Sequence, residues 1–271
     1  MAKTMKMSGK TASAAAPCFK RRVELLDELR GACVLCMLFY HGFFLAGDTF
    51  EISIFKSLFS FFMPAQPFFA SLFIFISGIS SRLSRNNLYR GLRLAAVAGA
   101  LSVTTSLLFP LIGIGGMSVL FGILHAISLS ILIFTLIRPI VEKINPALGF
   151  FVCFFIFAVT YGVQDGVIYL PFKTIPLPQS LYSHYYLFPL GFKSADFYSA
   201  DYFPLLPNLF IFLAGGFVGG YVAEDRIPSE FYEKHVPFLG SLGRRSLLIY
   251  AIHWPIIYIL LYLTAKLSER F

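Results

Sequence analysis

Seven apolar runs decide what this chain can fold into. They lie near residues 29–47, 66–83, 91–112, 117–137, 147–163, 204–222 and 245–264. A helix needs about 20 residues to cross the roughly 30 Å hydrocarbon core of a bilayer, and each run has about that length. The chain is 57% hydrophobic and 13% charged, which is about half the charged fraction of a soluble domain. We therefore expect an all-α polytopic membrane protein with about seven transmembrane helices in a lipid bilayer.

Three further segments are expected to lie outside the spans. Residues 52–63 are apolar but are followed closely by Pro64 and Pro67, which favours a helix lying in the membrane interface. The long connection 164–203 is rich in proline and tyrosine and is expected to be an outer loop that binds substrate or rests on the interface. Residues 1–19 contain no apolar stretch typical of a signal peptide. They are expected to be a disordered cytoplasmic tail before one domain over 20–271.

The positive charges predict the orientation. With the N-terminus in the cytoplasm, 17 of the 22 Lys and Arg residues fall on the cytoplasmic side, as the positive-inside rule requires. The inverted arrangement would reverse the bias of every loop. We expect a multi-pass protein of the cell (plasma or inner) membrane with a cytoplasmic N-terminus. The net charge of +8 then meets the anionic lipid surface, and no nucleic-acid partner is expected.

Three histidines lie inside the predicted spans, namely His41, His125 and His253. With a rise of 1.5 Å per helical residue, all three fall near mid-depth, where they could line one cavity. A single buried histidine is more often a hydrogen-bonded residue between helices than a catalyst. Three at matching depth favour a functional site, because imidazole exchanges a proton near neutral pH. Asp27 is too far along its helix to orient His41 and is expected to pair with Arg22 or Arg30.

Small residues and arginines give weaker signals. Gly215, Gly216, Gly219 and Gly220 form two overlapping G-x-x-x-G pairs, which predict close helix packing, inside the monomer rather than between monomers, although a homodimer stays open. Cys33 and Cys36 are expected to be packing residues rather than a redox pair. The arginines between residues 81 and 93 either set the topology or bind phosphate. The sequence contains no metal-ligand cluster, so no metal is expected.

Five ordered motifs resemble a known family. They are Arg22-x3-Leu26-Asp27-x2-Arg30-Gly31 followed by His41, Phe75-Ile76-Ser77-Gly78, Phe121-Gly122-Ile123-Leu124-His125, Asp201-Tyr202-Phe203-Pro204-x2-Pro207 and Leu242-Gly243-Arg244-Arg245-Ser246-Leu247-Leu248-Ile249-Tyr250-x2-His253-x-Pro255. Together they span about residues 21–264 and resemble the heparan-alpha-glucosaminide N-acetyltransferase catalytic-domain family, especially its bacterial branch. The first and last motifs are also similar to the wider acyltransferase-3 superfamily.

The resemblance implies acyl transfer across the membrane by an O- or N-acetyltransferase. An acetyl group of cytoplasmic acetyl-CoA would reach a hydroxyl or amine of an extracytoplasmic sugar or glycolipid. His41, eleven residues after Arg30, would be the base, and His125 or His253 would position the substrate or stabilise the oxyanion. The donor's phosphates would contact the arginines of the inner side, and the acceptor would contact polar residues of the outer side. These expected sites are Arg30, Arg82, Arg85 and Arg90 for the donor, and Asp48, Asp201, Tyr202 and Tyr250 for the acceptor.

The sequence departs from the animal members in two ways. Their reactive histidine lies in the loop after the first span, where the same spacing gives Ile52 here. The chain also lacks the animal lumenal extension, so heparan sulfate is not expected as the substrate. A different class stays open beside the enzyme, a proton-coupled transporter or flippase for a small anionic or glycan-linked substrate. Histidines at mid-membrane serve proton relays as well as catalysis.

Overall fold

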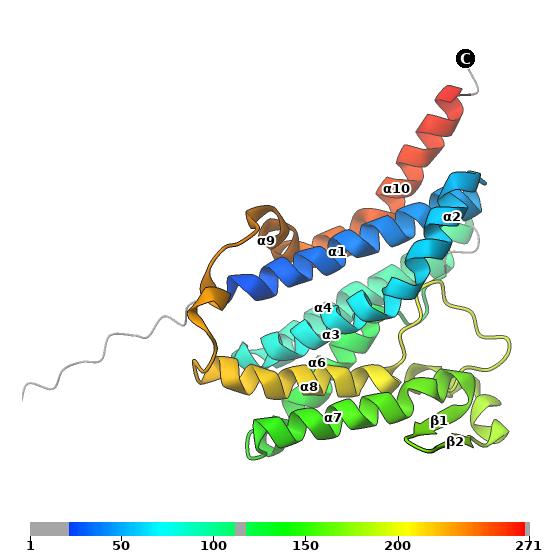
Figure 1. The fold of residues 1–271 in the computed structure, drawn as a ribbon. Helices are drawn as coiled ribbons and strands as arrows, with labels where there is room; N and C mark the ends of the chain where they lie inside the picture. The colour runs from blue at the N-terminus through cyan, green and yellow to red at the C-terminus, as the bar shows by residue number, and fades with distance from the viewer. Residues whose placement is uncertain (1–21, 112–117, 269–271) are drawn as a thin grey trace, which may run out of the picture.

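The computed structural model describes residues 22–111 and 118–268, and the tail expected over 1–19 lies outside this part of the chain. The described residues contain seven helical segments long and apolar enough to cross a membrane. They are Glu24–Thr49, Ser53–Leu83, Asn87–Leu111, Ile123–Val141, Pro146–Asp165, Leu205–Ala223 and Ser246–Thr264. The predicted all-α polytopic class is confirmed (Figure 1).

Consecutive long helices run in opposite directions through the bundle (Figure 1). They are α1 (Glu24–Phe44), α3 (Gln66–Leu83), α4 (Asn87–Val103), α6 (Ile123–Val141), α7 (Pro146–Thr160), α8 (Leu205–Ala223) and α10 (Ser246–Ser268). We call the end where α1 begins the basic end, because Arg30, Arg82, Arg85, Arg138 and Arg244 lie there. The opposite end carries the connection between α7 and α8, and we call it the loop end.

Short elements complete the two ends. At the loop end, a π-helical turn (Leu45–Thr49) extends α1, and a second one (Thr104–Leu108) with α5 (Phe109–Leu111) extends α4. The helix predicted over 52–63 is present as α2 (Ser53–Phe62), and one 3-10 turn (Met63–Ala65) joins it to α3. The long connection contains 3-10 turns and a hairpin of β1 (Val167–Leu170) and β2 (Lys173–Pro176), antiparallel with Val167 opposite Pro176. At the basic end, α9 (Pro237–Arg244) precedes α10.

The predicted fourth span begins too early. The apolar run suggested a helix from residue 117, but α6 begins at Ile123. The preceding residues instead pair with the loop before α8: the N–H of Ala200 donates to the Ser118 carbonyl at 2.8 Å, and that of Phe203 donates to the Phe121 carbonyl at 3.3 Å. These bonds satisfy the carbonyl groups of Ser118 and Phe121, which would otherwise need hydrogen-bond partners within a helical turn.

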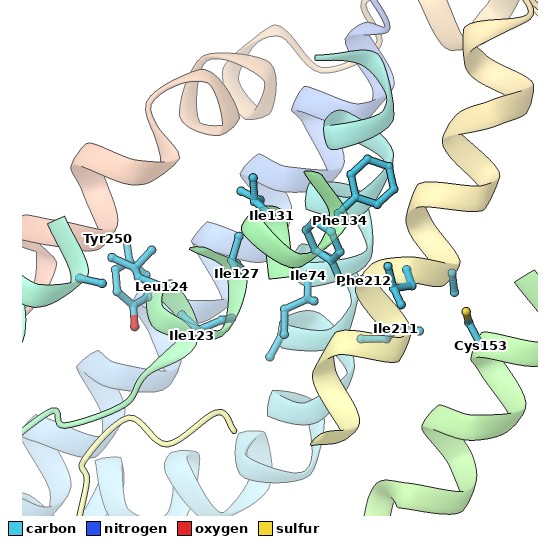
Figure 2. Packing of buried hydrophobic residues seen from close by; sticks show 14 of the residues in the cluster. Ile74, Ile123, Leu124, Ile127, Ile131, Phe134, Cys153, Ile211, Phe212 and Tyr250 are labelled. Atoms are coloured by element: carbon cyan, nitrogen blue, oxygen red, sulfur yellow. The ribbon is translucent and has the colours of Figure 1, made fainter. Parts of the chain in front are cut away.

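Helices α3 and α8 form the centre of the bundle, and their backbones touch. A Cβ atom on Gly78 would lie 1.9 Å from the carbonyl oxygen of Phe212, and one on Gly215 would lie 2.0 Å from that of Phe75. Only glycine permits this approach, which confirms the predicted close packing inside the monomer. Around it, Figure 2 shows the buried cluster that includes Phe134 of α6 and Phe212 of α8. Their rings meet edge to face with centroids 6.2 Å apart.

The first motif of the sequence fixes α9 against α1. A Cβ on Gly31 would lie 1.9 Å from the Leu239 carbonyl oxygen, and one on Gly243 would lie 1.8 Å from that of Asp27. The buried carboxylate of Glu28 accepts the N–H groups of His235 and Val236, both at 2.8 Å, and so fixes the two residues that precede α9. The acidic part of the motif therefore has an architectural role.

Candidate functional site

A cavity of about 340 Å³ lies between α1, α3, α6, α10 and the loop before α8. Along α1 it extends from Cys33 to His41, a distance of about 12 Å at 1.5 Å per residue. The polar lining gathers toward the loop end and includes Tyr40, His41, Gln66, Gln164, Lys193, Ser199, Asp201, Tyr202 and Tyr250. Its size and few convergent polar groups are typical of a small-molecule site.

Two of the three predicted histidines lie against each other, and one of them, His41, lines this cavity. The ring centroids of His41 on α1 and His253 on α10 are 5.0 Å apart. His41 is 8% exposed and His253 is 4% exposed. The Nδ1 atom of His41 and the Nε2 atom of His253 are both buried without a hydrogen-bond partner. Buried polar atoms are nearly always bonded, so two orphaned nitrogens on adjacent rings indicate a functional arrangement.

His125 lies elsewhere and is fully bonded. Because α6 begins at Ile123, this histidine occupies the first turn rather than the middle of a span. Its Nδ1 accepts the N–H of Gly122 at 3.1 Å, and its Nε2 lies 3.1 Å from the hydroxyl of Ser102. The Ser102 hydroxyl donates to the Val119 carbonyl at 2.7 Å, so Nε2 must be the protonated nitrogen and the donor to Ser102. His125 therefore holds the start of α6 against α4.

Asp201 connects the loop to two helices at the wall of the cavity. Its Oδ2 accepts the N–H of Ile123 at 3.1 Å and also accepts the hydroxyl of Tyr250. The first bond places a carboxylate at the N-terminus of α6, where the helix dipole favours negative charge. Burial raises the pKa of the Asp201 carboxyl above its ordinary value, and the two hydrogen bonds oppose the rise. The predicted contacts Asp201, Tyr202 and Tyr250 all line the cavity, whereas Asp48 is exposed on the π-helical turn after α1.

The four arginines expected to bind the donor fall into two groups, on different sides of the C-terminal end of α3. Arg30 donates to Asp27 at 2.9 Å and to the Ser80 hydroxyl at 2.8 Å. The predicted pairing of Asp27 with Arg22 and Arg30 is confirmed, because Arg22 contacts the same carboxylate at 2.5 Å. Arg90 of α4 reaches the same side of α3, where its guanidinium makes three bonds to the last helical turns of α3 and a fourth to Asn87 of its own helix. Arg90 therefore caps the C-terminus of α3 and has little capacity left for a ligand.

Arg82 and Arg85 line a separate pocket. Arg82 is two residues beyond Ser80, and its direction therefore differs by about 200° on a helix with 3.6 residues per turn. It faces α8 and α6, where Glu142 lies 3.2 Å from it and 2.8 Å from Arg138. Arg82, Arg85 and Arg138 share this pocket at the basic end. The structure thus brings together Arg30 with Arg90, and Arg82 with Arg85, but it does not unite the four.

Several lining residues carried no signal in the sequence. Gln66, Gln164 and Lys193 come from three distant segments and meet only because the loop folds back over the bundle. Cys33 also lines the cavity, as a free thiol. Met37 and Tyr40 follow Cys33 at helical spacing and also line the cavity. The residues of α1 that share a helix face with His41 could therefore have been predicted from the sequence. Among the described residues, no group of three His, Cys, Asp or Glu side chains is placed to hold a metal ion.

Comparison with known proteins agrees with the motifs. Neither the curated proteins nor the solved structures give a match. A family model does match, over residues 22–255, which include the whole cavity and both histidines of the pair. This match covers most of the chain and implies a transferase. The chain belongs to the family described as Heparan-alpha-glucosaminide N-acetyltransferase, catalytic.

Proposed function

We propose that this protein moves an acetyl group from cytoplasmic acetyl-CoA to a hydroxyl or amine of a sugar or glycolipid on the other side of the membrane. The observation that carries the proposal is the cavity along α1. At its loop end it is lined by His41, whose ring lies against that of His253, and its deep end at Cys33 lies one helical turn from Arg30. Family membership supports the class of reaction. In the proposal, the acetyl group of the donor and the attacking group of the acceptor meet in this cavity.

The charges support the orientation. Arginines gather at the basic end, and this end faces the cytoplasm in our proposal, because translocating them would be costly. The N-terminus is then cytoplasmic and the loop end lies outside, in the plasma or inner membrane. The donor consequently enters from the arginine side, and the acceptor enters past Gln164 and Lys193 of the loop.

The donor's phosphates are assigned to Arg30. The α3 wall of the cavity is formed by Gln66, Phe69, Ala70 and Phe73, and the same helical face continues to Ser77 and Ser80. Arg30 bonds to the Ser80 hydroxyl on this line. Arg90 also contacts Ser77 and Ser80, but its guanidinium is already used in four hydrogen bonds. The Arg30 guanidinium has five N–H groups, and Asp27 and Ser80 use only two of them. The pocket of Arg82 and Arg85 faces away from the cavity and is not needed for this path.

The chemistry requires a base at the acceptor, and His41 has the position for it. The acceptor oxygen or nitrogen attacks the thioester carbonyl while His41 takes its proton. The new C–O or C–N bond forms as the C–S bond breaks, and the CoA thiolate leaves and receives that proton. General-base catalysis of this kind contributes roughly 10²- to 10⁴-fold. The tyrosines and Asp201 supply hydrogen bonds for a polar acceptor.

The test is acetyl transfer in proteoliposomes. Purified protein receives labelled acetyl-CoA on one face and extracted envelope glycans and glycolipids on the other, and the label is followed by mass spectrometry. We expect labelled acceptor with the wild type and with His184→Gln, which changes an exposed histidine of the loop. We expect a loss of at least about 100-fold with His41→Gln. Full turnover by His41→Gln would disprove the assignment of the base.

The same liposomes separate an enzyme from a transporter. A transferase should be stabilised thermally by acetyl-CoA, because a ligand that binds only the folded state raises its stability. A proton-coupled transporter should move substrate with no acetyl group transferred. Movement of unmodified glycan together with indifference to acetyl-CoA would overturn the proposed reaction.

A further inference from the structure

The two orphaned histidine nitrogens are a matched donor and acceptor. His253 Nδ1 lies 2.7 Å from the backbone carbonyl oxygen of Tyr250. A carbonyl oxygen only accepts, so the proton of the neutral His253 ring is on Nδ1. Its Nε2 therefore carries a lone pair, and this lone pair is buried with no donor facing it. The bond to Tyr250 thus fixes the tautomer of His253.

The missing donor is on the adjacent ring. His41 Nδ1 is the other buried nitrogen without a partner at this site. An N–H···N hydrogen bond of about 3 Å places two imidazole centroids roughly 5 Å apart, since each nitrogen lies about 1.1 Å from its ring centre. The observed separation is 5.0 Å with the ring planes inclined at 46°. The two rings therefore lie at a centroid separation that such a bond permits, and the bond requires the His41 ring to direct its Nδ1–H at His253.

Two aromatic side chains pack against His41. Tyr40 lies edge-on to His41 with ring centroids 5.2 Å apart, and Trp254 lies against it at 5.2 Å. Tyr250 lies against His253 with ring centroids 5.4 Å apart, and its hydroxyl is already bonded to Asp201. Among the described residues, no carboxylate forms a hydrogen bond with either ring, so the second histidine is the candidate for the role that a carboxylate plays in many catalytic dyads.

We propose that His253 is a positioning residue that holds His41 as its Nδ1–H tautomer and so presents the His41 Nε2 lone pair to the cavity. The catalytic consequence of this inference rests on the proposed function, but the assignment of the tautomer does not. During transfer, the acceptor proton passes to His41 Nε2, and His253 Nε2 stabilises the resulting imidazolium through the Nδ1–H bond. The proton then leaves with the CoA thiolate. No net charge remains on the pair, which suits a buried site.

The tautomer is tested by ¹⁵N NMR of the full chain labelled at histidine, in lipid nanodiscs. The His41 signals are identified by their loss in His41→Gln, and His184→Gln is the control for an exposed histidine. We expect protonated Nδ1 and unprotonated Nε2 for His41 in the wild type. In His253→Leu, which keeps apolar bulk but removes the lone pair, we expect His41 to shift to a mixture of tautomers. A wild-type His41 protonated at Nε2 would overturn the proposal.

The catalytic consequence is tested by comparing two substitutions of His253. His253→Leu should lower kcat by about 100-fold while the KM of each substrate changes little. His253→Gln offers an amide oxygen as acceptor for His41 Nδ1–H. Its kcat should therefore be at least tenfold higher than that of His253→Leu. Equal losses in the two variants would show a packing role only and contradict the proposal. If the wild type transfers no acetyl group, the proposed function fails, while the NMR result still decides the tautomer.

Discussion

The contact between α3 and α8 makes a prediction whose size can be worked from the structure. In Gly78→Ala, the added Cβ would lie 1.9 Å from the Phe212 carbonyl oxygen. Real Cβ contacts are essentially never shorter than 3.0 Å, so the two helices must separate by at least about 1.1 Å at this point. The obstacle is backbone and not a movable side chain. We expect a destabilisation of about 2–4 kcal/mol, slightly above the usual 1–3 kcal/mol for an overpacked core.

The measurement is the unfolding midpoint in mixed micelles of increasing SDS, followed by near-UV circular dichroism. Gly99→Ala on α4 is the matched control, because no atom lies within 4 Å of its added Cβ. That variant should be neutral or more stable by up to about 1 kcal/mol, the helical advantage of Ala over Gly. Separation of α3 also moves the cavity wall at Phe73, so Gly78→Ala should lose acetyl transfer as well. If both variants unfold at the same SDS fraction, the backbone contact is wrong.

Three further outcomes test other parts of the site. Arg30→Lys keeps the charge but loses the planar guanidinium group, and it should raise the KM of acetyl-CoA about tenfold. Arg85→Gln should leave that KM unchanged. The reverse pattern would place the donor in the pocket of Arg82 and Arg85. In Asp201→Asn, the amide oxygen can still accept both hydrogen bonds made at Oδ2, but the negative charge is lost. This variant should raise the KM of the acceptor with little change in the unfolding midpoint. Asp201→Ala loses both hydrogen bonds and should lower the unfolding midpoint as well. The hydrogen bond from Arg138 holds the pKa of Glu142 below its ordinary value. The stability from that pair is present at neutral pH and is lost as pH falls through the lowered pKa. Glu142→Gln should remove this small acid-sensitive part of the unfolding curve, and an unchanged curve would show that the pair contributes nothing.

The sequence was sufficient for features that depend on one helix at a time. Seven spans follow from hydropathy and length. The Asp27–Arg30 pair follows from a spacing of three residues. Direction around α3 also follows from spacing, because Ser80 and Arg82 differ by about 200° on a regular helix. That difference by itself directs Arg82 away from the side of α3 that Arg30 contacts.

Features that depend on contacts between distant segments could not be predicted from the sequence. The apolar residues from Val119 to Phe121 read as helix, and only their hydrogen bonds with the loop before α8 show otherwise. That displacement moved His125 from mid-span to a helix start. The pairing of His41 with His253 needs the crossing of α1 and α10, 212 positions apart in the chain, and no periodicity in either helix encodes it.

The backbone contact at Gly78 and Gly215 also limits how this protein can diverge. Where two main chains touch, any added side chain must push the helices apart, so this part of α3 and α8 tolerates little variation. Relatives with other acceptors must then differ at the walls that side chains build, such as Gln164 and Lys193 of the loop. A library randomised at those two positions should yield folded proteins with altered acceptor preference. One randomised at the two glycines should yield almost none that fold.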